Sequence, residues 1–533
     1  MLFDRVKPLD AILATAEKKG LTRSLGAFQL TMLGIGGVIG TGIFVLTSEA
    51  AQKAGPGMLL SFVAAGIVCA VAALCYSELA SMVPVSGSAY TYTYAVVGEL
   101  LAWMVGWSLI LEYALGASAV SVGWSNHAIG LLNASGYHFP AAISNADALM
   151  AHVQMAFGSP PNADLLAAAA TGGWINVPAI VIALVAMSLL IVGTTESAAV
   201  NAVLVAIKLL ALTAFCIITL PAMKTGYFTP LLPTGTIGMF GAAASIFFAY
   251  VGFDAVSTAA EETKNPQRNV PIGLIGSLAI CTIFYLVVAS GAIGAIGAQP
   301  VVGALGQVLS PGSAEIAGRC ASIVAGGAIE PLVCSREALV HVLQVLGHPV
   351  MGWLVGLAAV LALPSVVLMM MYGQTRIFFT MARDGLLPGR LAAIHPRFRT
   401  PHVVTWVTGI ATALAAACLP VGKLADYSNS GTLFAFAMVA VSVMVLRKAD
   451  PTRHRPFRTP LVWLVAPVAI IGCLGLYASL TLSAILVLPG WGAVGLLVYF
   501  LYSRPRSHVG RGVVDVPEPE AYTGTEPPVP ATH

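Results

Sequence analysis

The feature that most constrains this chain is a series of long apolar segments that recur along almost its whole length. A helix needs about 20 consecutive apolar residues to cross the hydrocarbon core of a bilayer. We read about twelve such segments, the last of them shorter than this length: 28–52, 57–80, 98–132, 174–193, 198–221, 237–259, 271–297, 350–382, 403–420, 427–446, 461–484 and 489–503. Only 9% of the 533 residues are charged, against roughly 25% in soluble domains. The sequence therefore predicts an all-α integral membrane protein.

Composition and motifs exclude several functional classes. The net charge is only +3, so the chain has no strong basic field that would attract nucleic acid. It contains no GxxxxGK[ST] loop for ATP phosphates and no CxxC pattern of a metal site. We therefore expect no cofactor, no metal, no nucleic-acid partner and no enzymatic activity.

The eight cysteines fall into two groups. Cys320 and Cys334 lie in a long connection, 298–349, where a disulfide and two free thiols are equally compatible with the sequence. The other six lie in or beside apolar segments, where inert packing is the expected role: Cys69, Cys75, Cys216, Cys281, Cys418 and Cys473.

The distribution of lysine and arginine predicts the orientation in the membrane. With an even number of crossings and a cytoplasmic N-terminus, about 20 of the 26 basic residues fall on the cytoplasmic side. We therefore expect a multi-pass protein of the cell membrane with segment 1–25 and tail 504–533 in the cytoplasm. The tail is rich in proline and is expected to be disordered.

The first apolar segment contains five glycines within the nine residues GIGGVIGTG. Each glycine costs about 1 kcal/mol in a helix interior, so the segment predicts a broken helix. Such a break is allowed in a bilayer only where it lines a cavity or is buried in protein, and there its free N–H groups can hold a carboxylate. Close packing of helices through small residues is the alternative reading of the same glycines.

The sixth apolar segment has a comparable interruption, in which Gly252 stands beside Asp254. A carboxylate inside the membrane is costly and is a functional candidate by default. Interrupted helices at corresponding positions of two halves mark a binding site near the membrane midplane. We therefore predict two five-helix halves, 26–221 and 237–446, followed by two further helices in 461–503.

Three more ionisable residues lie within apolar segments. Glu78 stands near the end of the second segment and is interpreted as an interfacial residue. Glu112 lies deeper, where a buried partner and a structural hydrogen-bonding role are both open. Lys208 is the most costly group in the chain, because apolar residues continue for more than two turns beyond it; the alternative is that it reaches the cytoplasmic interface.

Six stretches of the chain resemble the cationic amino acid transporter family of the amino acid–polyamine–organocation superfamily. They are GIGGVIGTGIFVL (34–46), CYSELASMVPVSGSAYTYTY (75–94), GWSLILEYALGASAVSVGWS (106–125), FFAYVGFDAVSTAAEETKNPQRNVP (247–271), YGQTRIFFTMARDGLLP (372–388) and HPRFRTP (395–401). The chain departs from this family in the long connection 298–349 and in Pro364. The resemblance implies a fold of two inverted repeats of five helices, with broken first and sixth helices, plus two extra helices.

The resemblance also implies a binding arrangement. Backbone N–H groups of Gly40, Thr41 and Gly42, with the Thr41 hydroxyl, would hold the substrate carboxylate. Carbonyl groups of the two broken helices would hold the substrate ammonium: Val38, Ile39, Phe248, Ala249 and Val251. The substrate side chain would face Phe253, Leu363, Ser365 and Asn429.

The function implied is secondary active transport of amino acids, and we expect proton-coupled symport of small neutral ones by alternating access. Burial favours the neutral form of a lysine, so Lys208 could gain and lose a proton. In this family the matching lysine is thought to brace the broken first helix, here near Gly36 and Gly37. We assign proton coupling to Lys208, with Glu112 as a second candidate. The alternatives are a transporter or exchanger of cationic amino acids or polyamines, and a sensor that does not transport.

Overall fold

The computed structural model describes residues 5–9, 12, 24–83, 87–157, 163–193, 198–303, 306–309, 314–327, 330–398 and 400–513. These residues are mostly helical, as the sequence predicts, with one sheet of two short antiparallel strands. Eight helices are long and apolar enough to cross a membrane, and four apolar helices are shorter. The exact number of crossings stays a prediction.

The α-helices occur in this order: α2 (Ala27–Val38), α3 (Thr41–Phe44), α4 (Leu46–Ala54), α5 (Met58–Met82), α6 (Ser88–Val96), α7 (Glu99–Ala134), α8 (Asp147–Ala156), α9 (Ala163–Thr171), α10 (Val177–Val192), α11 (Ala198–Thr219), α12 (Gly235–Ile246), α13 (Pro266–Ile296), α14 (Ala314–Ala325), α15 (Ala338–Val345), α16 (Pro349–Arg383), α17 (His402–Cys418), α18 (Val421–Ala449), α19 (Val462–Ala478), α20 (Leu482–Val498) and α21 (Arg504–Arg506). Strands β1 (Ser144–Asn145) and β2 (Ile175–Asn176) pair with Ser144 opposite Asn176.

Short 3-10 and π segments connect or extend these helices. They are η1 (Gly55–Gly57), η2 (Ala141–Ile143), η3 (Thr225–Phe228), η4 (Phe247–Tyr250), η5 (Asp254–Glu262), η6 (Leu332–Cys334), η7 (Gly389–Ala392), the π-helical η8 (Tyr499–Ser503) and η9 (Val509–Arg511).

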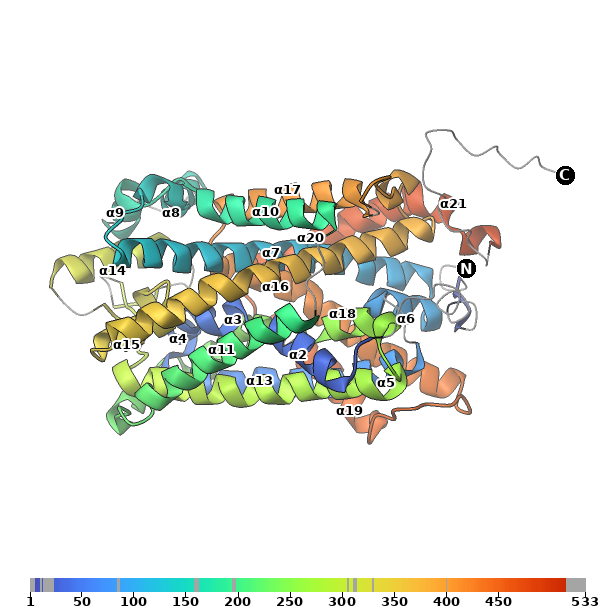
Figure 1. Ribbon diagram of the computed structural model, residues 1–533, viewed down its shortest axis with the longest axis horizontal. Helices are drawn as coiled ribbons and strands as arrows, with labels where there is room; N and C mark the ends of the chain where they lie inside the picture. The colour runs from blue at the N-terminus through green and yellow to red at the C-terminus, as the bar shows by residue number, and fades with distance from the viewer. Residues whose placement is uncertain are drawn as a thin grey trace.

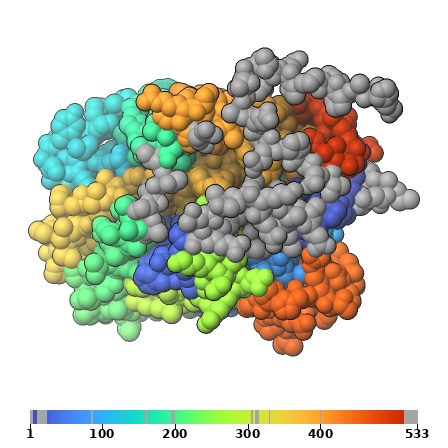
Figure 2. All heavy atoms as spheres, turned by 45° about the vertical axis from the view of Figure 1, so that its right-hand side comes forward, coloured from blue at the N-terminus to red at the C-terminus, as the bar shows by residue number. Residues whose placement is uncertain are grey.

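The long helices run along the long axis of the molecule (Figure 1), and α7 packs against both α16 and α18. Helix α13 packs against α2 and α5. The short helices α8, α9, α14 and α15 gather at one end, and α21 lies at the other. In Figure 2 the cyan surface near residue 150 adjoins the yellow surface near residue 330, because α14 packs on α9.

The helix boundaries differ from the sequence prediction in three places. The connections 133–173 and 298–349 contain helices α8, α9, α14 and α15, and α6 was not predicted. The boundary between the last two apolar segments also lies earlier in the sequence than predicted, since α19 ends at Ala478 and α20 begins at Leu482. The intervening turn lies inside a nearly continuous apolar run, so hydropathy did not reveal it.

Two prolines within the helices leave carbonyl groups that other side chains satisfy. Pro364 has no N–H to donate to the carbonyl of Val360, and the indole Nε1 of Trp124 donates to that oxygen at 2.9 Å. Pro489 likewise leaves the carbonyl of Ile485 without a backbone donor, and the Tyr477 hydroxyl donates to that oxygen at 2.6 Å. Pro364 is therefore accommodated within a continuous α16.

The structure shows which cysteines are bonded and which are free. Cys320 and Cys334 form a disulfide that ties α14 to η6. The other six are free thiols, and five of them are buried, as expected for packing residues.

Candidate functional site

The first apolar segment is broken where the glycines predict. Helix α2 ends at Val38, Ile39 has the extended backbone angles φ −74° and ψ 91°, and α3 begins at Thr41. The first N–H groups of a helix have no acceptor within it, so the start of α3 presents free donors at the break. The predicted break is therefore present, and the binding of a carboxylate at it stays a prediction.

The sixth segment is broken as well. Helix α12 ends at Ile246, and after η4 the chain turns at Gly252, whose φ of +115° strongly favours glycine. The buried carboxylate of Asp254 accepts from the Gly252 N–H at 3.2 Å and from the Tyr113 hydroxyl at 3.0 Å. Asp254 therefore holds the turn of the break in place.

The two breaks cross each other in direct backbone contact. A Cβ atom on Gly42 would lie 2.3 Å from the Cα of Ala249, and one on Gly252 would lie 2.9 Å from the carbonyl oxygen of Gly37. Neither distance allows a side chain. Close approach, which the sequence left as an alternative to a break, therefore occurs together with it.

A tyrosine that sequence reasoning did not single out links the two broken segments. The buried hydroxyl of Tyr285 on α13 lies 2.7 Å from the carbonyl oxygen of Val38 and 2.8 Å from that of Ala249. A carbonyl oxygen has two lone pairs, so each can still accept a second donor. The signal that could have found Tyr285 is a hydroxyl group in the middle of an apolar segment.

The backbone positions predicted to bind substrate lie at the crossing. Val38, Ile39, Gly40, Thr41 and Gly42 form the first break, although the Thr41 side chain lies outside the described part of the structure. The predicted positions of the sixth segment, Phe248, Ala249 and Val251, lie in or directly after η4. The Phe248 carbonyl accepts from the Val251 N–H at 3.2 Å.

The side chains predicted to line the pocket are buried but engaged with the protein. Phe253 packs against Phe436, with ring centroids 5.3 Å apart. The Asn429 amide donates to the carbonyl of Ala244 at 2.7 Å, and the Ser365 hydroxyl donates to a carbonyl of its own helix.

Leu363 is fully buried on α16, but other residues of that helix approach the first break. The nearest atom to a Cβ on Gly40 belongs to Val366, at 3.4 Å, and Met369 lies 2.8 Å from the corresponding position on Gly37. Val366 and Met369 are three residues apart and share one helix face. Leu363, three residues before Val366, was predicted from the sequence, but Val366 and Met369 were not.

Lys208 lies where the resemblance implies. It is fully buried on α11, and its Nζ donates to the carbonyl oxygen of Gly36 at 2.8 Å. The lysine therefore braces the last turn of α2, directly before the break.

Glu112 on α7 is fully buried, and neither carboxylate oxygen accepts a hydrogen bond of ordinary geometry from the described residues. The neighbouring residue Tyr113 donates to Asp254, so this part of α7 adjoins the sixth break. An isolated carboxylate in a low-dielectric region is stable only when it is protonated or paired with a cation.

A largely buried ion pair flanks one end of the crossing. The Lys53 ammonium on α4 lies 2.9 Å from the carboxylate of Asp426 on α18, and Ser245 on α12 contacts both. This cluster joins the segments that follow and precede the two breaks. Beside it lies a cavity of 680 Å³, into which α4 presents Val45, Ser48, Glu49 and Gln52.

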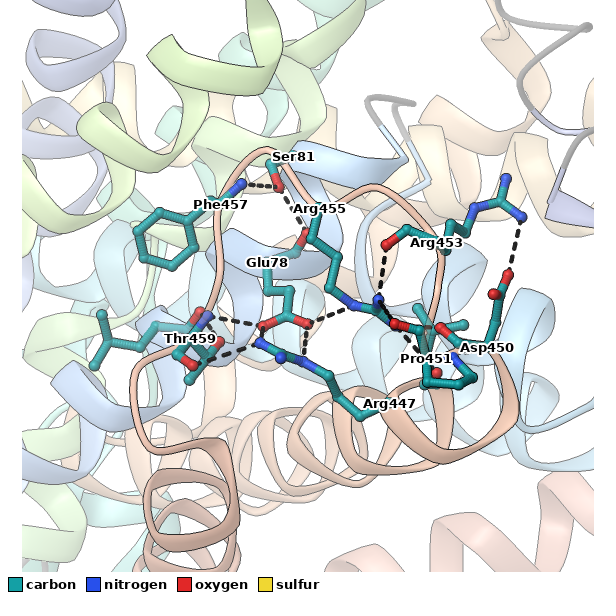
Figure 3. A network of polar contacts seen from close by, with 11 residues as sticks. Glu78, Ser81, Arg447, Asp450, Pro451, Arg453, Arg455, Phe457 and Thr459 are labelled. Carbon is teal, nitrogen blue, oxygen red and sulfur yellow. Dashed lines mark hydrogen bonds and ion pairs between the residues drawn. The ribbon is translucent and has the colours of Figure 1, made fainter.

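The opposite end is held by a second polar network (Figure 3). The Glu78 carboxylate accepts two bonds from Arg447, at 2.7 and 2.8 Å, and the backbone N–H of Thr459 at 2.8 Å. Arg455 lies 3.3 Å from the same carboxylate. Glu78 is thus buried and paired near the end of α5, and its interfacial position stays a prediction. Its arginine partners are remote in sequence, so hydropathy did not reveal them.

The fold and this crossing of two interrupted helices define a multi-pass membrane transporter. A family model for amino acid permeases matches residues 25–492. The chain is 42% identical to a branched-chain amino acid permease of Bacillus subtilis (strain 168), over 96% of this chain and 99% of that protein. It is 39% identical to a methylthioribose transporter of the same organism, over 94% and 98%, and 33% identical to the vacuolar cationic amino acid transporter 2 of Arabidopsis thaliana, over 84% and 63%.

The chain belongs to the amino acid permease family of the amino acid–polyamine–organocation superfamily. It is an amino acid transporter and not an enzyme. The family resemblance read from the sequence is confirmed.

Proposed function

We propose that this protein is a proton-coupled symporter of small neutral amino acids that works by alternating access. The observation that carries the proposal is the buried bond from Lys208 to Gly36, 2.8 Å long. Charged Lys208 donates strongly to this carbonyl and stabilises the broken first helix. Neutral Lys208 donates more weakly, so proton loss favours a different state of that helix. Such a difference between states is what coupling requires.

The crossing of the two breaks is the proposed substrate site. Free N–H groups at the start of α3 suit a carboxylate, and the carbonyls of Val38 and Ala249 suit an ammonium group. The face of α16 that approaches the break is apolar, with Val366 and Met369. This favours a small neutral side chain, in keeping with the name of the branched-chain permease.

A cationic substrate is the second candidate, and Glu112 is the observation that favours it. Its buried carboxylate lies one residue from Tyr113 and, among the described residues, accepts no hydrogen bond of ordinary geometry, although the Thr432 side chain interacts with it. A guanidinium or ammonium group could pair with it. Competition of labelled alanine by arginine at excess would support this candidate, whereas competition by valine and not arginine supports the neutral one.

The orientation proposed is one with both ends of the chain in the cytoplasm of a cell-membrane protein. Arg5 donates to the carbonyl of Arg504 at 2.8 Å, so the first and last described segments lie on the same side. The excess of basic residues on this side supports the cytoplasmic assignment.

The proposal is tested by uptake of labelled alanine into liposomes that contain the purified protein. An inward proton gradient without sodium should drive accumulation, and a protonophore should abolish it. If counterflow is present but the gradient drives no accumulation, the protein is an exchanger and the coupling proposal fails. If neither occurs with any amino acid, a sensor becomes the better interpretation.

The side-chain wall is tested with Leu363→Ser, which replaces a bulky buried group with a small hydroxyl. We expect broader selectivity toward larger or basic amino acids in competition assays. An unchanged competition profile would remove Leu363 from the wall and leave Val366 as the candidate.

A further inference from the structure

A second pocket, of 300 Å³, lies at the end of the molecule that carries α21, and the transport site does not involve it. It lies between the end of α16, the connection that follows and the last helices of the described chain. Its lining residues are Ala382, Arg383, Gly385, Leu387, Gly389, Ala392, Tyr502, Arg506, His508 and Arg511.

The lining combines three arginines with no carboxylate. Within the described chain, Arg383, Arg506 and Arg511 form no salt bridge. The Arg506 guanidinium lies 4.0 Å from the centre of the Tyr502 ring, and the Arg511 Nε donates to a backbone carbonyl at 3.3 Å. These contacts orient the two arginines without neutralising them.

The adjacent acidic residue is already occupied. Asp384 is 3% exposed, and its carboxylate is bonded to the Lys7 ammonium at 2.7 Å and to the Tyr90 hydroxyl at 2.8 Å. His508 also stays uncharged near neutral pH, because burial lowers its pKa and the positive charge of Arg511 lowers it further, against the opposing effect of Asp384. The pocket therefore holds an excess of positive charge that suits an anion.

The pocket stands at the transition from apolar to polar surface. Helix α20 and η8 expose Leu497, Phe500 and Leu501, which are 61%, 43% and 75% exposed. Arg506 follows Leu501 by little more than one turn. A group bound by these arginines would lie level with lipid headgroups while its apolar part contacted the exposed side chains.

We propose that this pocket binds the phosphate group of an anionic phospholipid. Arginine binds phosphate through paired, charge-assisted hydrogen bonds, and basic pockets between membrane helices bind lipid headgroups in this way. The same chemistry would fit free phosphate. The apolar lining from Leu387 and Ala392, together with the exposed apolar surface of η8, favours the lipid.

The test is native mass spectrometry of the full chain with phosphatidylglycerol and with phosphatidylcholine. The wild-type protein should retain phosphatidylglycerol in preference. The double variant Arg506→Gln/Arg511→Gln should bind it about 30-fold more weakly, from the typical contribution of two arginines near a charged membrane surface. Arg268→Gln, an exposed arginine outside the pocket, is the matched control and should bind as wild type.

Two further measurements complete the test. Thermal unfolding in phosphatidylcholine alone should be unchanged in the double variant; if it is lowered, Arg383→Gln replaces it and should weaken retention. Inorganic phosphate at millimolar concentration should not displace the lipid. Equal retention by wild type and pocket variants, equal loss in the Arg268 control, or full displacement by phosphate would each overturn the proposal.

Discussion

Replacing Lys208 by methionine tests the coupling proposal most directly, because methionine keeps an unbranched apolar stem and removes the charge. The bond from Nζ to the Gly36 carbonyl is buried and 2.8 Å long. A hydrogen bond of this kind, with a charged donor, contributes about 1.5–3 kcal/mol. Since each 1.36 kcal/mol is a factor of ten, Lys208→Met should weaken the preference for the braced first helix about 10- to 150-fold.

The effect on transport follows from the energy of the proton gradient. One proton per substrate and a gradient of one pH unit support about tenfold accumulation. Wild type should approach that ratio in liposomes without sodium, whereas Lys208→Met should stay near equal concentrations inside and outside. Surviving counterflow would show that the variant is folded. Lys448→Met, at an exposed lysine, is the matched control.

The reasoning would be refuted if Lys208→Met accumulated alanine as well as wild type under the same inward proton gradient. Proton coupling would then have to reside elsewhere, and Glu112 would be the next residue to change. Loss of both counterflow and accumulation would require the same measurement on Lys208→Arg, which keeps the positive charge. If Lys208→Arg responded to the gradient as wild type does, a proton equilibrium specific to lysine would be excluded.

Three further outcomes are expected. Gly42→Leu should abolish substrate binding in a thermal-shift assay, because even its Cβ would lie 2.3 Å from the sixth segment; normal binding would move the site elsewhere. Burial, assisted by Glu330, raises the pKa of Glu337 to about 8, so the folded state binds this proton more tightly and stability should fall as pH rises from about 4.5 to 8. Glu337→Gln should remove that part of the pH dependence of Tm, and an unchanged profile would contradict it. Cys320→Ser/Cys334→Ser should leave transport intact and destabilise the α14 region by up to about 3 kcal/mol, seen as faster hydrogen exchange; two free thiols in the non-reduced wild type would refute the bridge.

Much of the architecture follows from local features of the sequence. Apolar length predicts most of the long helices to within a few residues. In lipid, the backbone N–H and C=O groups of an uncharged run of this size must hydrogen-bond to one another, as they do in a helix. The cluster of glycines around Gly37 predicts the first break, since glycine lowers helix stability, and Gly252 beside Asp254 predicts the second. The turn near residue 480 was misplaced because its residues do not interrupt the apolar run.

The partners of the buried polar groups were decided by the tertiary structure. Family resemblance predicted the contact of Lys208 with the first helix, but nothing local indicated that Tyr285 joins the two breaks. Glu78 and Arg447 are 369 residues apart and meet only when α5 and α18 pack.

The sequence by itself thus determined that this chain is helical, crosses a membrane and is interrupted at two points, a glycine-rich one in the first segment and Gly252 in the sixth. The tertiary structure decided which groups meet at those points. For example, Pro364 leaves the carbonyl of Val360 without a backbone donor, and the indole of Trp124, on a helix far away in the sequence, donates to it. The physical reason is that a buried polar group must find a partner, and the partner available depends on which helices pack together.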